Sequence, residues 1–339
     1  MKTIKTIRKP IVTAIAAISF TMAASAYAAN VSTTFQQGFG NAIEVDQTYG
    51  GVGSDNLSDV SQVGNDNDAT VNQSGGGNDS LVDQDGNDNN ALVNQNGIAS
   101  VSDVFQTGEG HDATITQTGD DHLSEVDQVG DNHMSTVTQE GQLNDSFITQ
   151  NDSGTAGHTA TVSQDGVGNL STVIQGGFGA PLPSNATVTQ IGNAHDSFVQ
   201  QNRRNNTATV YQEGFFNNTS EIYQNNNSTA TVTQIGSLNQ SFVDQRPSGG
   251  NEATATVSQS GALHDSSIIQ RSFRLNNATV TQTGINNSSN IDQDGQGTGR
   301  NTATVTQGGV GNNESDIFQV GGYKYLFKSN RAISSVTTE

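Results

Sequence analysis

Hydrophobic and polar residues alternate along this chain in a unit of about eleven residues. Each unit ends in a glutamine, and Val or Ile stands two positions earlier in all 24 units from Gln47 to Gln319. Ala or Ser usually stands four positions before the glutamine, and Asn six before. Positions two residues apart point to one face of an extended chain. The alternation therefore predicts one β-strand per unit, with this face buried and the intervening Thr, Asp, Glu and Ser side chains facing solvent.

A glycine two positions after most of the glutamines predicts a tight turn between strands. The fourth position before the glutamine alternates between Ala and Ser, as at Ala69 and Ser80, so the true repeat is about 22 residues. We therefore expect an all-β fold, a two-sheet parallel β-solenoid (β-helix) of about twelve 22-residue strand-turn-strand-turn rungs. Adjacent rungs of such a stack lie ~4.8 Å apart.

Buried Gln and Asn side chains in such a stack can hydrogen-bond to their copies in the rungs above and below, as in cross-β ladders. We predict a structural ladder that includes Gln62, Gln73, Gln84, Gln95, Gln106, Gln117, Gln128, Gln139, Gln150, Gln282, Gln293, Gln307, Gln319, Asn276, Asn287, Asn301 and Asn313.

Composition leaves two interpretations open. The chain has 38 Gly, no Trp and 31% hydrophobic residues, which is too few for an ordinary globular core of this length. Acidic chains rich in Asn and Gly often stay disordered because they bury little apolar surface. The unbroken Val/Ile register favours an ordered solenoid, reached from a chain that is unfolded before assembly.

The chain divides into four predicted segments. Residues 1–28 resemble an export signal, with four basic residues, the apolar stretch Ile11–Met22 and the small-residue site Ala26–Ala28. That stretch is too short to span a bilayer, and we expect no transmembrane span elsewhere. Residues 29–46 form an N-terminal segment with the first repeat strand, residues 47–319 the repeat solenoid, and residues 320–339 a basic and aromatic tail that could cap the stack or dock elsewhere. The sequence contains no cysteine, so the exported protein would form no disulfide.

Charge argues against nucleic acid as a partner. Without residues 1–28 the chain keeps 9 basic and 33 acidic residues, a net charge of −24. Outward acids such as Asp59, Asp83 and Glu125 are either solvated surface or residues that slow premature association of the strands.

All six histidines occupy the position six before a glutamine, where Asn is otherwise most common. His111, His133 and His158 fall in one column on consecutive rungs and are candidates for a pH-sensitive column. The imidazole can replace the Asn amide as a hydrogen-bonding group, and no Cys or fixed carboxylate completes a metal site. We predict no metal site, no cofactor and no catalytic residues, because every polar residue repeats with the rungs and none forms a singular constellation.

Two other functions rest on weaker patterns. Acidic turns such as Gly64–Asp68 suggest calcium, although they lack the nonapeptide repeat of calcium-binding β-rolls. Thr229, Thr231 and Thr233, with similar threonines in other units, suggest a monomeric ice-binding or adhesive solenoid, but Tyr211 interrupts that face.

The recurring pattern Ser-x5-Gln-x-Gly-x-x-Asn-x-Ala-x3-Gln, seen in Asn218–Gln245 and Asn276–Gln293, resembles the curlin repeat of bacterial curli fibre subunits. The resemblance spans about residues 36–321 and is specific because the pattern recurs so often. It implies a secreted structural subunit that self-polymerises head-to-tail into curli-like functional amyloid fibres for surface adhesion and biofilm matrix. It also implies an outer-membrane curli-type secretion pore and a fibre nucleator, or minor curlin, as partners, and an extracellular location on a Gram-negative-type cell surface. The nucleator itself is the alternative role. The chain departs from the familiar subunits in having about twelve repeats rather than about five.

Overall fold

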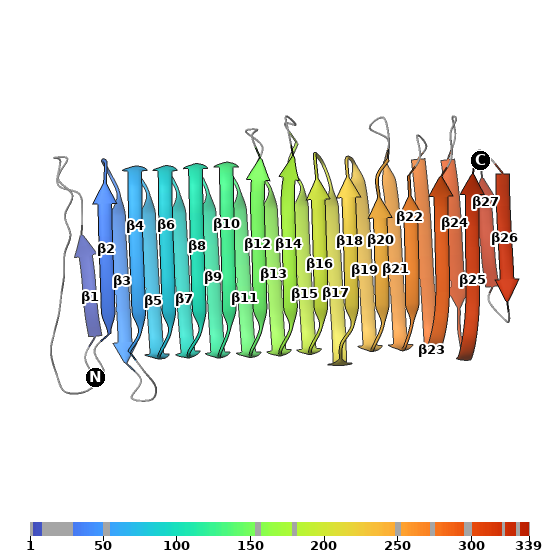
Figure 1. Ribbon diagram of the computed structural model, residues 1–339, viewed down its shortest axis with the longest axis horizontal. Helices are drawn as coiled ribbons and strands as arrows, with labels where there is room; N and C mark the ends of the chain where they lie inside the picture. The colour runs from blue at the N-terminus through green and yellow to red at the C-terminus, as the bar shows by residue number, and fades with distance from the viewer. Residues whose placement is uncertain are drawn as a thin grey trace. The chain divides into compact units, whose positions relative to one another are not determined.

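A computed structural model describes residues 3–8, 30–49, 55–152, 157–177, 182–247, 252–271, 275–294, 300–320, 323–329 and 333–338. The chain forms two compact units, Met1–Gly168 and Asn169–Glu339, each of which is described by itself below. Within the described residues every regular element is a β-strand (Figure 1).

Short strands of similar length build the first unit. They are β1 (Thr3–Arg8), β2 (Val31–Gln37), β3 (Ala42–Tyr49), β4 (Leu57–Asn65), β5 (Asp68–Gly76), β6 (Asp79–Asn87), β7 (Asn90–Ile98), β8 (Val101–Glu109), β9 (Asp112–Asp120), β10 (Leu123–Asp131), β11 (Met134–Gln142), β12 (Asp145–Asp152) and β13 (Thr159–Val167).

Each strand from β2 to β11 pairs in parallel with the strand two places further along the chain. The pairings thus form an even series, β2 to β12, and an odd series, β3 to β13. Register follows the sequence repeat, because Gln62 pairs with Gln84, and Gln84 with Gln106. β1 differs, pairing antiparallel with β3.

The second unit continues the same type of strand. Its strands are β14 (Leu170–Gly177), β15 (Asn185–Asn193), β16 (Asp196–Asn202), β17 (Thr207–Phe216), β18 (Thr219–Asn225), β19 (Ser228–Ser237), β20 (Gln240–Gln245), β21 (Ala253–Ala262), β22 (Asp265–Gln270), β23 (Leu275–Asp294), β24 (Arg300–Gln307), β25 (Val310–Val320), β26 (Tyr323–Ser329) and β27 (Ile333–Thr338).

In this unit β23 serves both series. Its first half pairs with β21 and β24, and its second half pairs with β22 and β25. The turn between the halves contains Gly284 at φ +99° and Asn286 at φ +58°, while Ile285 keeps ladder pairs on both sides. The extended pairing therefore runs through a turn that the sequence pattern places between two separate strands.

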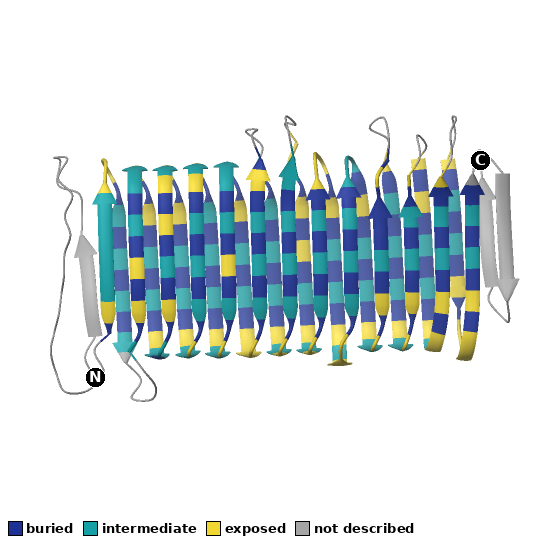
Figure 2. Ribbon diagram, in the orientation of Figure 1, coloured by how far each residue is buried: buried dark blue, intermediate teal, exposed yellow. Residues whose placement is uncertain are grey.

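The core is a narrow stack of Val, Ile, Ala and Gln side chains. In both units the Val or Ile two positions before each glutamine is at most 2% exposed. Figure 2 shows the resulting alternation of buried and more exposed residues along the repeat strands. Full burial of such an aliphatic side chain contributes roughly 1.5–3 kcal/mol. Stability therefore depends on repeating one modest contribution in every strand.

The expected fold class is confirmed: the chain is all-β and forms a parallel β-solenoid. The division into two separate sheets and the number of twelve rungs stay predictions. The apolar stretch and cleavage site of the expected export signal lie outside the described residues. Within the described ranges no helix is long and apolar enough to cross a membrane.

Buried serine hydroxyls form a column in the even series of the first unit. Ser80, Ser102 and Ser124 are not exposed, and none of their Oγ atoms has a partner among the described residues. Ser135, in the odd series, instead donates to Gln150 Oε1 at 2.8 Å and accepts from Gln128 Nε2 at 3.1 Å.

Ser102→Ala is expected to leave the free energy of unfolding unchanged or raise it by up to about 1 kcal/mol, because it removes a buried polar group that makes no bond. Ser135→Ala is expected to lower it by about 1 kcal/mol, since two bonds are lost. Guanidinium midpoints of both variants test this. Equal losses in the two would show that the Ser102 hydroxyl does have a partner.

Candidate functional site

Inward glutamines form continuous ladders of side-chain amides. In the even series Gln62 Nε2 donates to Gln84 Oε1 at 2.7 Å, and Gln84 donates to Gln106 at 2.7 Å. Gln106 donates to Gln128, and Gln128 to Gln150, both at 2.9 Å. The odd series has the same bonds at 2.8–3.0 Å through Gln73, Gln95, Gln117 and Gln139.

The glutamine amides also donate hydrogen bonds to backbone carbonyl groups. The second Nε2 hydrogen of Gln106 is directed at the carbonyl of Asn90 at 2.9 Å, and that of Gln117 at the carbonyl of Val101. Because donor and acceptor capacity are both used, a polar side chain can fill the core without an unsatisfied amide. The ladder links the rungs and joins the two strand series within each rung.

The second unit contains the same ladder to its last repeat strand. Gln282 donates to Gln307 at 2.8 Å, and Gln293 donates to Gln319 at 2.6 Å. Asparagine amides also bond directly, because Asn301 Nδ2 lies 3.0 Å from Asn276 Oδ1. Asn313 Nδ2 lies 2.6 Å from Asn287 Oδ1.

The position six before the glutamine connects each turn with the next one. Asn67 Oδ1 accepts the backbone N–H of Asn89, and Asn89 Oδ1 accepts that of His111, both at 3.0 Å. Asn67 Nδ2 meanwhile donates to the carbonyls of Val63 and Gly86. This position therefore requires a side chain with one acceptor facing the next rung and one donor facing the turn.

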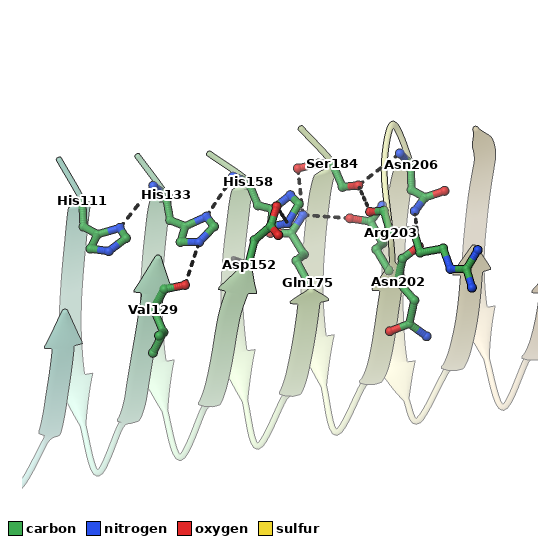
Figure 3. Close-up of polar contacts among 11 residues, drawn as sticks. His111, Val129, His133, Asp152, His158, Gln175, Ser184, Asn202, Arg203 and Asn206 are labelled. Carbon is green, nitrogen blue, oxygen red and sulfur yellow. Dashed lines mark hydrogen bonds and ion pairs between the residues drawn. The ribbon is translucent and has the colours of Figure 1, made fainter. Parts of the chain in front are cut away.

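Histidine meets the same requirement with its two ring nitrogens (Figure 3). His111 Nδ1 accepts the backbone N–H of His133 at 3.2 Å, and His133 Nδ1 accepts that of His158 at 2.9 Å. His133 Nε2 lies 3.1 Å from the carbonyl of Val129 and donates to it, which fixes the neutral Nε2–H tautomer. The three rings stack with centroids 5.2 Å apart.

Burial disfavours the charged form of these rings. Desolvation, together with the neighbouring His158 and His111, lowers the pKa of His133 to about 4. Desolvation also lowers the pKa of His111 and of His158, although Asp152, 3.7 Å from His158, acts in the opposite direction. Since both nitrogens of His133 already bond to backbone groups, this ring has no lone pair left for a metal ion.

One glutamine of the ladder, Gln36, lacks the Val or Ile that stands two positions before each of the 24 glutamines in the sequence pattern. Gln36 Nε2 donates to Gln62 Oε1 at 2.8 Å, and β2 pairs with β4 in the same register. Thr34 replaces the usual Val or Ile two positions before it. A search that accepts any β-branched residue at that position would have included Gln36.

The two ends of the repeat array differ in their backbone pairing. At the N-terminal end β2 pairs in parallel with β4, its single partner among the described strands, while β3 pairs with β5 and with β1. At the C-terminal end β26 pairs antiparallel with β25, and β27 pairs antiparallel with β24. β26 and β27 thus lie along the last strand of each series.

Comparison with known proteins gives one family match. The model of a family described as the curlin associated repeat matches residues 64–97, 103–130 and 226–261. No curated protein matches the chain.

Proposed function

Because this chain carries curlin associated repeats and belongs to the curlin-repeat family, we propose that it self-polymerises into curli-type amyloid fibres. In this proposal it is a secreted subunit whose cell-surface fibres serve adhesion and the biofilm matrix. The observation that carries the proposal is the ladder of glutamine amides, which repeats in register and begins at the N-terminal end with Gln36, whose amide donates to Gln62 as Gln62 donates to Gln84. The repeat family and the solenoid fold point to a structural protein rather than an enzyme.

Growth follows from the backbone at that end. An edge strand presents unpaired N–H and C=O groups to another chain, and among the described strands β2 pairs with β4 alone. A second copy that adds a parallel strand beside β2 would extend both the backbone ladder and the glutamine ladder. Head-to-tail contacts of this kind do not close, so they produce a filament.

The tail strands oppose this growth at the C-terminal end. β26 and β27 occupy the backbone edges that a following chain would use, so both must leave before the C-terminal end can accept a copy. The two tail strands then act as a removable cover, and their release is a step in polymerisation.

Export partners follow from the family resemblance. We propose that an outer-membrane curli-type pore passes the unfolded chain and that a nucleator, or minor curlin, starts the fibre. A covered C-terminal end also favours a second candidate, in which this chain is the nucleator and offers a single open end for templating.

The test is to incubate purified residues 29–339 without calcium. Thioflavin fluorescence monitors polymerisation during the incubation, and fibre diffraction characterises the product. We expect a lag, then fibres with cross-β spacings of ~4.7 and ~10 Å. A small seed is expected to shorten the lag. A β-rich monomer that never polymerises would contradict the subunit proposal.

A variant that ends at Gln319 separates the two roles. If the tail strands cover the growing end of a subunit, the truncated chain is expected to polymerise with a shorter lag than the full chain. A full-length chain that does not polymerise but shortens the lag of another curlin subunit would assign the nucleator role.

A further inference from the structure

Charge is divided very unequally between the two units. Residues 10–168 carry 22 Asp and Glu and no Lys or Arg, a net charge of −22. Residues 169–339 carry 11 acidic and 9 basic residues, a net charge of −2. Two copies that meet through their first units repel each other strongly, whereas the net repulsion between the first unit of one and the second unit of another is far weaker.

Arginines of the second unit gather on the turns that follow its even strands. Arg203 and Arg204 follow β16, Arg246 follows β20, and Arg271 follows β22, and all four are exposed. Backbone bonds stack these turns: the Asn227 N–H donates to the carbonyl of Arg204 at 3.0 Å. This basic turn edge covers three turn spacings, about 14 Å.

A buried carboxylate orients part of the basic turn edge. Asp244 is 1% exposed and lies 2.7 Å from both Arg246 and Arg271, whose guanidinium groups are half exposed. With Glu252 on the same connection as Arg246, the four arginines outnumber the two carboxylates and leave an excess of positive charge. Asp294, the last residue of β23, ends the positive stretch.

The first unit has a matching row of carboxylates on the turns after its even strands. The row consists of Asp66 after β4, Asp85 and Asp88 at the end of β6 and on its turn, Glu109 at the end of β8, and Asp131 at the end of β10. These turns also stack through the backbone, as the Asp88 N–H donates to the carbonyl of Asn65 at 3.0 Å. This acidic turn edge also covers three turn spacings, about 14 Å.

We propose that the basic turn edge of one chain docks laterally on the acidic turn edge of a second copy of this chain. Both rows are set by the same rung spacing, so several Arg and carboxylate groups meet in one register. The contact runs along the side of the solenoid, separate from the strand edges that add copies end to end. It rests on the proposed function, because it bundles filaments that must first form.

The opposite turn edge of the first unit is a poorer match. There the carboxylates lie on the turns after β9, β11 and β13 and at Asp55 after β3, while the turns after β5 and β7 carry none. Leu143 and Val167, which are 54% and 42% exposed, interrupt that row. The pair Glu140 and Asp165 on this opposite edge therefore supplies a matched control.

Charge reversal in full-length chains tests the docking. Arg203→Asp with Arg204→Asp changes two exposed arginines that do not contact Asp244. Asp85→Lys with Glu109→Lys changes the acidic turn edge at residues without positive φ. Glu140→Lys with Asp165→Lys changes net charge by the same amount on the opposite edge, and a chain with the first two pairs combined restores complementarity.

Wild-type filaments are expected to bundle at low salt and to separate near 1 M salt, where the Debye length is about 3 Å. Each edge variant is expected to lower the fraction of fibres that sediments at low speed by about tenfold, the factor that corresponds to 1.4 kcal/mol. The combined variant restores sedimentation, and the control pair behaves like wild type. Thioflavin growth curves are expected to be the same for wild type and all variants. A variant that fails to polymerise is therefore distinguished from one that polymerises but does not bundle.

Bundling that persists in the Arg203 and Arg204 variant, or is lost equally in the Glu140 and Asp165 control, would overturn the proposal. Filaments that bundle only after an anionic polysaccharide or DNA is added would also overturn it, and would assign the basic turn edge to a polyanion instead.

Discussion

Gly108→Ala is expected to prevent the stacking of β8 on β10 and to lower the free energy of unfolding by roughly 3–5 kcal/mol. A Cβ atom at Gly108 would overlap the carbonyl oxygen of Gly130 in the next turn and lie 2.8 Å from its carbonyl carbon. The backbone there has φ +133°, which L-residues rarely adopt. Because the obstacle is backbone held by the neighbouring rung, no side-chain rotation relieves it.

Gly168→Ala is the matched control. Gly168 has φ +68°, and a Cβ added there meets nothing within 4 Å. We expect a loss of about 1–2 kcal/mol from the left-handed conformation alone. Guanidinium midpoints and thioflavin growth rates compare the two variants. Similar losses of unfolding free energy in the two variants would show that the backbone conformation alone requires glycine at these positions. Close approach of the turns would then play no part.

Acidification is expected to destabilise the first unit through its histidine column. The pKa of His133 is about 4 in the fold against 6.5 in the unfolded chain, so the unfolded state binds the proton first. The contribution of His133 is therefore complete above pH 6.5, decreases as the pH falls from 6.5 toward 4, and changes no further below that. At pH 5 the loss is about 2 kcal/mol by linkage. Protonation of Nδ1 would also remove the acceptor for the His158 N–H.

His133→Asn isolates this effect, because asparagine occupies the same position in neighbouring turns. Guanidinium midpoints at pH 7.5 and pH 5 are expected to differ less in the variant than in wild type. Desolvation raises the pKa of Asp103 and of Asp127, which opposes acid destabilisation at lower pH, but that contribution is common to both proteins. An identical pH shift in wild type and variant would contradict the prediction.

Sequence and structure agree where the relevant geometry is local. The alternation around Val60 and Gln62 decides which face of a strand is buried, and the 22-residue repeat decides that Gln62 lies beside Gln84. Both follow from the two-residue period of an extended chain. Gln36 escaped the pattern because Thr34 preserves the strand without preserving the residue type. The turn at Gly284 was expected to separate two strands, and backbone pairing on both sides keeps it within β23.

The sequence by itself determined the all-β class, the parallel register and the composition of the narrow core, because each depends on a short period repeated many times. Only the tertiary structure decided which groups meet between rungs. It gave His133 a backbone donor and a backbone acceptor, and it brought Arg246 and Arg271 to one buried carboxylate. It also laid β26 and β27 along the last strands. These contacts form between residues that the fold of the chain brings together, and the short sequence period does not specify which residues those are.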